Sequence, residues 1–297
     1  MNRSLNRLAL ALLLPLLLVA GCSSSSSDDG PGPDESDNAQ PAPSRSHSSS
    51  PSEAPTQSAS PEADRGRWQP KPGVAWQWQL TGKLDPTVNV PVYDVDGFNI
   101  SKAQVDDLHR RGRKVICYVS TGAWEDFRPD ADSFPKSVLG KGNGWKGERW
   151  LDIRRTDVLG PLMAKRFDMC KQKGFDAVEP DNMDGYSNET GFPLTAAHQL
   201  AYNRLVARLA HDRGLAVGLK NDLDQIPDLV RDFDFAVNEQ CAEFGECDQL
   251  APFTRAGKAV FHVEYDRNPG AFCSQARKLG LSSMQKQKEL GTWRKAC

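Results

Sequence analysis

Two neighbouring carboxylates at the end of a predicted strand are the residues whose type and spacing point most directly to chemistry. The segment Phe175–Tyr186 begins with a short apolar run and then carries Glu179, Asp181 and Asp184. Side chains alternate along a strand, so Glu179 and Asp181 lie on the same face. Two like charges this close shift each other's pKa and can hold one proton between them, as acid–base sites require.

A second acidic strand end, Asn238–Glu239, supplies a partner for this pair. Hydrolysis of a glycosidic bond needs two carboxyl groups that flank the bond, one as acid and one as nucleophile or base. Asp181 and Glu239 would end two strands of one sheet and could face one substrate. Lys220 ends the strand between them, where it could hold a carboxylate ionised or form a purely structural ion pair.

The elements that must position these residues alternate between short apolar strands and helices. Strands are predicted at 75–80, 90–95, 114–120, 176–181, 215–220, 235–239, 258–265 and 281–286, helices at 101–111, 157–173, 195–213, 222–232, 247–256 and 271–279, and a long loop at 121–149. This alternation indicates an α/β fold with a parallel sheet and right-handed crossovers. Eight strands over residues 68–297 favour a single-domain (β/α)8 TIM-type barrel. An open doubly wound sheet is the alternative, but no glycine-rich phosphate turn follows the first strand.

Active groups of such a barrel lie at the C-terminal ends of its strands. One strand-end aspartate means little, because strand ends meet solvent, but here several strands end in an acidic residue. The candidates for substrate binding are Trp78, Tyr93, Asp94, Asp96, Tyr118, Glu179, Asn182, Asp184, Tyr186, Lys220, Asn221 and Glu264. An acidic cleft rich in aromatic residues would suit a cationic or neutral sugar.

The N-terminus has the layout of a secretory signal. Residues 1–21 carry Arg3 and Arg7, and the apolar run Leu8–Ala20 is short for a membrane span. The run ends in Leu-Val-Ala-Gly-Cys, which resembles the lipobox of bacterial lipoproteins. That resemblance implies cleavage before Cys22 and lipidation of this cysteine. An ordinary signal peptide with a chance cysteine is the alternative.

Residues 22–67 differ sharply in composition from the rest of the chain. From Ser23 to Arg67 there is no Val, Ile, Leu, Met or aromatic residue, and Ser, Pro, Asp and Glu are dense. Such a segment cannot bury enough apolar surface to fold, so it predicts a disordered tether. We therefore expect an extracytoplasmic domain, 68–297, attached to the membrane only through its N-terminal lipid. A monomer is expected.

Charge and cysteine content narrow the partners and cofactors. The formal net charge is −2, and about −4 without the two arginines of the signal, with no basic patch, so nucleic acid is not an expected partner. Beyond Cys22 the cysteines are Cys117, Cys170, Cys241, Cys247, Cys273 and Cys297. An even number in an extracytoplasmic chain predicts disulfides, and of the 15 pairings only Cys241–Cys247 is favoured, by proximity.

Other chemistries lack their motifs. The cysteines show no CxxC spacing and no neighbouring histidine, and the five histidines show no metal spacing, so neither a metal nor a cofactor is expected. His262 on a predicted strand is expected to be a satisfied core residue. No G-x-S-x-G elbow supports a serine hydrolase.

Several motifs in consistent order resemble one enzyme family. They are 175–184, Trp76–Leu80, Val92–Asp96, Gly218–Asn221 and Val237–Cys241. They resemble glycoside hydrolase family 114, the endo-α-1,4-polygalactosaminidases, over essentially residues 76–286. Gly97, after Asp96, stands where a bulkier apolar residue would be expected.

The resemblance implies a (β/α)8 barrel that cleaves polymers of α-1,4-linked galactosamine, often partly N-acetylated, from within the chain. It implies retention of configuration, with Asp181 as nucleophile and Glu239 as acid/base. Two alternatives stay open: a non-catalytic glycan-binding lipoprotein on the same barrel, and a hydrolase of another α-linked glycan.

Overall fold

The computed structural model describes residues 66–297. The expected signal peptide, Cys22 and nearly all of the expected tether lie outside the described residues. Within 66–297, no helix is both long and apolar enough to cross a membrane.

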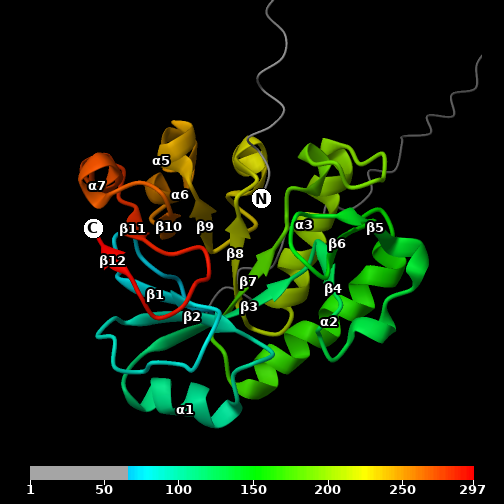
Figure 1. Ribbon diagram of the computed structural model, residues 1–297, viewed down its shortest axis with the longest axis horizontal. Helices are drawn as coiled ribbons and strands as arrows, with labels where there is room; N and C mark the ends of the chain where they lie inside the picture. The colour runs from blue at the N-terminus through cyan, green and yellow to red at the C-terminus, as the bar shows by residue number, and fades with distance from the viewer. Residues whose placement is uncertain (1–65) are drawn as a thin grey trace, which may run out of the picture. The chain divides into compact units, whose positions relative to one another are not determined.

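One curled sheet carries the predicted strands (Figure 1). Its strands are β1 (Trp76–Gln79), β2 (Val92–Asp96), β3 (Lys114–Ser120), β7 (Ala177–Asp181), β8 (Ala216–Lys220), β9 (Phe235–Glu239), β10 (Val260–Glu264), β11 (Ser282–Gln285) and β12 (Lys295–Ala296), paired in that order. All pairs from β1 to β11 are parallel, and β12 is antiparallel to β11. The eight predicted strands are therefore confirmed, including the weak last one.

Helices follow each parallel strand from β2 to β10. They are α1 (Lys102–Arg110), α2 (Thr156–Lys173), α3 (Ala196–His211), α4 (Ile226–Leu229), α5 (Cys241–Phe244), α6 (Ala251–Arg255) and α7 (Pro269–Lys278). Ser101 and Thr195 each begin a helix with a capping box, in which the side chain accepts the N–H three residues on. The predicted helices at 222–232 and 247–256 are shorter, because 3₁₀ turns, Leu223–Gln225 and Cys247–Leu250, form their first parts.

Strand alternation builds two apolar layers. On one face, Tyr93, Val95 and Val115 join the cluster that packs against the helices. On the other face, Trp76, Val92, Ile116, Ala177, Ala216, Phe235 and Phe261 form a second buried cluster inside the curled sheet. Farther along the same inward stripes, the side chains become charged: Ala177 is followed by Glu179 and Asp181, and Ala216 by Lys220. The buried apolar cluster therefore lies directly beneath the charged residues at the C-terminal ends of the strands.

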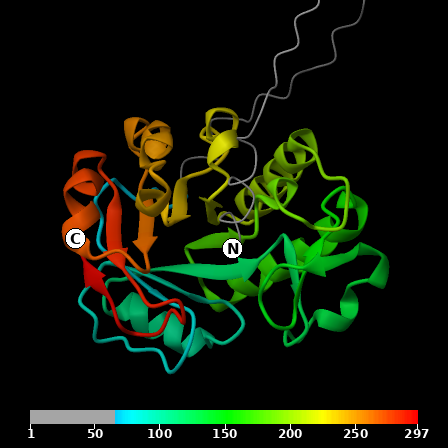
Figure 2. The same cartoon turned by 45° about the horizontal axis from the view of Figure 1, so that its top comes forward.

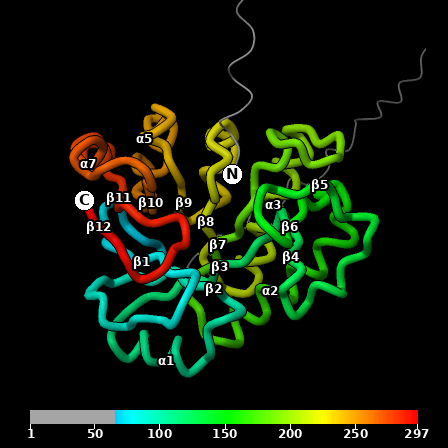
Figure 3. The backbone as a smooth tube through the Cα atoms, viewed as in Figure 1, coloured from blue at the N-terminus to red at the C-terminus, as the bar shows by residue number. Residues whose placement is uncertain are grey.

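The C-terminal segment bridges the two ends of the sheet (Figures 2 and 3). Among the described strands, β1 and β11 form no ladder with each other. Instead, the Trp76 indole donates to the Ser282 carbonyl at 2.8 Å, and the Leu80 N–H donates to the Leu290 carbonyl at 2.9 Å. The Cys273–Cys297 disulfide fixes the end of this segment to α7. This is the predicted (β/α)8 arrangement, with its seam covered by residues 286–297.

The prediction of a long loop over residues 121–149 is wrong. This part of the chain folds into a second, antiparallel sheet of β4 (Ala123–Glu125), β6 (Glu148–Leu151) and β5 (Leu139–Gly142), in that order. It lies between β3 and α2 in the sequence and beside the C-terminal ends of β3 and β7 (Figure 1). These short strands contain few apolar residues and several glycines, so the apolar pattern of the sequence does not reveal them.

Three disulfides join the six cysteines of the domain. Cys241–Cys247 is confirmed, and the other pairs are Cys117–Cys170 and Cys273–Cys297. The Cys117–Cys170 disulfide explains the glycine at position 97, because a Cβ there would collide with the Cys117 sulfur. Glycine there makes room for the disulfide that links β3 and α2.

Candidate active site

Lys220, the last residue of β8, is the centre of the site. Its ammonium nitrogen lies 2.8 Å from Oδ1 of Asp181, 3.2 Å from Oε1 of Glu179 and 3.3 Å from Oε2 of Glu239. The Lys220 side chain is 2% exposed. Burial alone would lower the pKa of Lys220, but the three carboxylates outweigh it and raise that pKa well above its ordinary value. Lys220 is thus a permanent cation between three acids.

Asp181 ends β7 and is the most open of these acids, with a side chain 20% exposed. The Tyr118 hydroxyl donates to its Oδ2 at 2.7 Å, and the Asn182 N–H donates to its Oδ1 at 2.8 Å. Burial favours the neutral acid, but the charge and hydrogen bond of Lys220, with those two donors, lower the pKa of Asp181. Asp181 is therefore held as a carboxylate that can reach a ligand.

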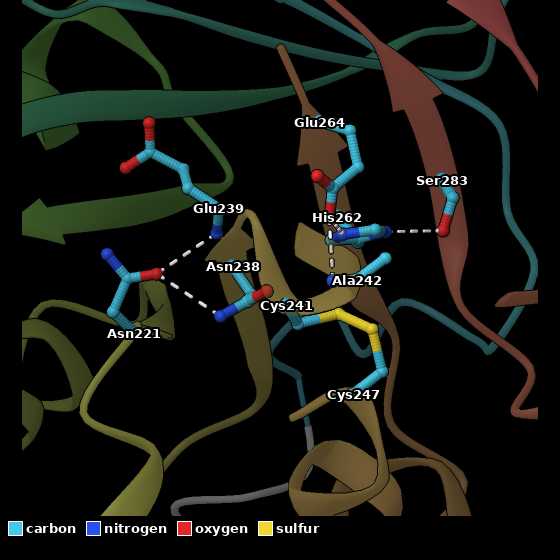
Figure 4. The surroundings of a disulfide bond; sticks show 9 residues. All are labelled: Asn221, Asn238, Glu239, Cys241, Ala242, Cys247, His262, Glu264 and Ser283. Carbon is cyan, nitrogen blue, oxygen red and sulfur yellow. Dashed lines mark hydrogen bonds and ion pairs between the residues drawn. A yellow bond between two sulfur atoms is a disulfide. The ribbon is translucent and has the colours of Figure 1, made fainter. Parts of the chain in front are cut away.

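Glu239 ends β9 on the other side of Lys220. The Tyr265 hydroxyl donates to its Oε1. The Glu239 N–H donates to the side-chain oxygen of Asn221 at 3.0 Å, and the Asn238 amide donates to the same oxygen at 3.3 Å, as Figure 4 shows. Burial of Tyr265, and the charge of Glu239 beside it, raise the pKa of the tyrosine well above its ordinary value, so it stays a donor.

Two acids and a tryptophan that were expected to bind substrate lie beneath this layer instead, too buried to touch a ligand, which corrects those assignments. Asp94 and Glu179 are fully buried, and Trp78 is 1% exposed with its ring centroid 5.0 Å from the Lys220 nitrogen. Burial, then the charge and hydrogen bond of Glu179, raise the pKa of Asp94 well above its ordinary value. Burial also raises the pKa of Glu179, against the pull of Lys220. Asp94 is therefore the acid of this pair that favours the protonated form, and Glu179 is coupled to Asp94 as well as to Asp181.

Backbone strain is concentrated at these strand ends. Asn182, Asn221, Asp222 and Gln240 all have φ between 46° and 65°. Asn182, Asn221 and Gln240 directly follow Asp181, Lys220 and Glu239, three charged strand ends of the site, and Asp222 comes after Asn221. Left-handed backbone is costly for residues other than glycine and persists where surrounding contacts hold it, most often at functional sites.

Tyr93 and Asp96, both expected to bind substrate, are used elsewhere. Tyr93 faces the helices, and its hydroxyl donates to the carbonyls of Asp85 and Val88. The Asp96 carboxylate lies 2.7 Å from the Arg128 guanidinium and accepts the N–H groups of Phe98 and Asn99. Neither side chain is free to meet a sugar, so we correct both assignments.

The other expected binding residues divide into three groups. Tyr118, Asn182 and Asn221 are half-buried at the strand ends beside Asp181 and Glu239. Asp184 and Tyr186 are half-buried in the loop after β7, where the Tyr186 N–H donates to Gln199. Glu264 is fully buried and binds the Ala242 N–H, which corrects its assignment as a substrate contact.

Two residues outside the expected binding set lie beside the site. Tyr265 ends the predicted strand 258–265, so the strand-end rule already made it a candidate. Glu148, on β6 opposite Glu125, had no such signal, because the second sheet was not foreseen. Burial raises the pKa of Glu148 to about 7 against a hydrogen bond from Asn143, and the charges of Glu125 and Asp181 add to the rise.

One group within residues 66–297 has the spacing of metal ligands. Cys241, Cys247 and His262 offer ligand atoms that all lie within 4.8 Å of one another. The two sulfurs form a disulfide, and the ring nitrogens of His262 contact Ser283 and Glu264. These residues do not fit a resident metal in this state.

One protein-family model matches this chain. Residues 57–297 match the family model for glycoside hydrolase family GH114. A search of curated proteins gave no match.

Two solved structures are similar to this chain. A crystal structure of Ega3 from Aspergillus fumigatus in complex with galactosamine is 39% identical, with a TM-score of 0.74 over 78% of this chain and 98% of that chain. The glycoside hydrolase domain of PelA from Pseudomonas aeruginosa is 14% identical, with a TM-score of 0.58 over 75% and 97% of the two chains. At that identity PelA shows a shared fold alone.

Proposed function

The chain belongs to glycoside hydrolase family GH114, and we propose that it cleaves α-1,4-linked galactosamine polymers from within, using Asp181 and Glu239. One observation carries the proposal. Two acids from different strands contact one buried ammonium, and each has its own tyrosine donor, Tyr118 or Tyr265. Asp181 is the more exposed of the two, at 20% against 4% for Glu239, so it is the acid that is open to the sugar.

In the first step Asp181 is the nucleophile. Its lowered pKa keeps it ionised, and its partial exposure lets the free lone pair reach the anomeric carbon of the sugar. A bond forms between Asp181 and that carbon while the glycosidic C–O bond breaks. Glu239, which enters this step in its protonated form, gives that proton to the departing oxygen. Lys220 stays charged and offsets the negative charge that Glu239 gains.

In the second step a water molecule displaces Asp181 from the anomeric carbon. Glu239, now ionised, takes a proton from a water that attacks the anomeric carbon, and the bond to Asp181 breaks. The Lys220 nitrogen contacts both acids, so their nearest oxygens are at most about 6 Å apart. Retention of configuration is proposed from the resemblance of the sequence motifs to the family.

The sugar is proposed from charge and from the similar structure. Even while Glu239 holds its proton, the site sets one lysine against the carboxylates of Asp181 and Glu179, so it is electronegative towards a ligand. An amino sugar carries an ammonium at neutral pH, which such a site attracts. The Ega3 structure, 39% identical to this chain, holds galactosamine. Among the expected binding residues, Tyr118, Asn182 and Asn221 lie beside Asp181 and Glu239, and we propose that they contact the sugar.

The experiment is release of reducing ends from a defined galactosamine polymer. The wild-type domain, Asp181→Asn and Glu239→Gln are compared at equal concentration, with the product sizes separated. We expect oligomers from the wild type and a loss of roughly 10⁴-fold or more in both variants. Equal release by all three proteins would refute the assignment, and monomer as the sole product would refute endo cleavage.

Two other functions are outcomes of the same experiment. If the polymer is retained but not cut by any of the three proteins, the barrel is a glycan-binding module. If a neutral α-linked glycan is cut and the galactosamine polymer is not, the site serves another sugar.

We also propose that the domain is exported and held at a membrane through lipid on Cys22. The apolar run before this cysteine and the polar segment up to Arg67 support the proposal. Radiolabelled palmitate should enter the full chain expressed in a bacterium, and Cys22→Ser should abolish the label. Equal labelling of the two chains would contradict it.

A further inference from the structure

Three histidines of the domain share one arrangement. In each, a single carboxylate oxygen accepts a backbone N–H and also contacts Nε2 of the histidine. The three sets are His109, Asp176 and the Val115 N–H; His211, Asp234 and the Val217 N–H; and His262, Glu264 and the Ala242 N–H. The oxygen contacts are 2.7–3.0 Å in all three. Asp176 and Asp234 also pair with Lys114 and Arg67, and the three sets differ further in where they lie in the barrel.

Two of these sets lie at the N-terminal end of the barrel. Asp176 directly precedes β7 and Asp234 directly precedes β9, and each carboxylate ties its own strand to the strand beside it. Residues at this end of a (β/α)8 barrel serve stability, because the active groups lie at the opposite end.

The third set lies at the opposite end, next to Glu239 (Figure 4). Glu264 is the last residue of β10, and its oxygen accepts the Ala242 N–H at 2.7 Å, three residues after Glu239. His262 connects this carboxylate to Ser283, since its Nδ1 lies 2.9 Å from the serine hydroxyl. Glu264 and His262 are fully buried, so no ligand can touch them.

The turn that Glu264 holds is also strained and cross-linked. Gln240, between Glu239 and α5, has φ 65°, and its N–H donates to the Val263 carbonyl at 2.8 Å. The Cys241–Cys247 disulfide closes the segment that follows. A left-handed residue directly after Glu239 persists only if neighbouring contacts hold it.

We propose that Glu264 is a positioning residue that fixes the Glu239 carboxylate by anchoring the start of α5. The inference rests on the proposed role of Glu239. Without the Ala242 contact, Gln240 can relax towards ordinary backbone, and Glu239 turns away from Lys220 and Tyr265. A displacement of about 1 Å at a catalytic group can cost on the order of 10²-fold in rate.

The test compares Glu264→Ala with Asp234→Ala, the same deletion in the matching set at the far end of the barrel. Both should lower the thermal midpoint. Only Glu264→Ala should lower kcat, by roughly 10–100-fold with KM within about twofold, since the substrate contacts remain. Glu264→Gln keeps an acceptor oxygen for the Ala242 N–H and should restore most of kcat. If Glu264→Ala and Asp234→Ala have the same kcat per folded molecule, the proposal is wrong.

Two further variants keep the result decisive. If Glu264→Ala does not fold, Glu264→Asp replaces it: this variant keeps the charge but withdraws the oxygen from Ala242. A fall in its kcat beyond that of Asp234→Asn supports the proposal, and an unchanged kcat overturns it. Wild type and Glu239→Gln are measured alongside. An inactive wild type refutes the proposed function, whereas an active wild type with no Glu264 effect refutes only the positioning role.

Discussion

The Lys220 ammonium lies 2.8 Å from Oδ1 of Asp181, closer than to either of its other two carboxylate partners. This contact joins the ends of β7 and β8 and lowers the pKa of the aspartate despite burial. A nucleophile that must be ionised is thereby kept ionised in a place that would otherwise favour its neutral form.

Lys220→Met should weaken catalysis and move its pH dependence. Without the ammonium the pKa of Asp181 rises, so the acid limb of the kcat/KM profile should move to higher pH. The loss of electrostatic support should lower kcat/KM by on the order of 10²–10³-fold. A pH series with the galactosamine polymer measures both effects, and an unmoved acid limb would show that Lys220 does not tune Asp181.

Asp94→Asn should stabilise the domain at neutral pH. Burial and Glu179 raise the folded pKa of Asp94, so its contribution to stability is full below the unfolded pKa and is lost as pH rises towards the folded pKa. Asparagine copies the protonated form and avoids that loss. Thermal midpoints should therefore be higher for the variant near pH 8 and nearly equal to wild type near pH 3. A lower midpoint at pH 8 would contradict the protonation of Asp94.

Tyr265→Phe should reduce kcat through Glu239. The variant removes a hydrogen bond to a carboxylate, a contact worth about 1.5–3 kcal/mol, so a loss of roughly 10–100-fold is expected. Tyr93→Phe is the matched control, because that hydroxyl donates to main-chain carbonyls on the helix-facing side of the sheet. Steady-state kinetics of the two variants should separate them, and equal losses would argue against a specific role for Tyr265.

Cys297→Ser should destabilise the domain without removing its activity. The Cys273–Cys297 disulfide spans 24 residues and holds the segment that covers the seam between β1 and β11. Loss of a cross-link of this size costs about 2–4 kcal/mol. Urea unfolding should show the smaller free energy, while reducing-end release at low temperature stays near wild type. Unchanged unfolding would mean that the segment is held by its hydrogen bonds alone.

The sequence by itself determined the elements and the end of the barrel at which the site lies. Apolar periodicity gave Lys114–Ser120 and Phe235–Glu239 with their observed bounds, and Ser101 and Thr195 marked two helix starts. These signals are local, since each depends on residues within a few positions of one another. Alternation also separates Tyr93 from Asp94 onto opposite faces, so the misplacement of Tyr93 could have been avoided.

Only the tertiary structure decided which groups meet. Glu179 and Asp181 share a face, but Lys220 contacts both of them, and Asp94 is the acid whose pKa Glu179 helps to raise. The Cys117–Cys170 pairing and the second sheet could not be predicted from the sequence either. Contacts between strands depend on register and on how far the sheet curls, and those are set by the packing of the whole core rather than by neighbours in the chain.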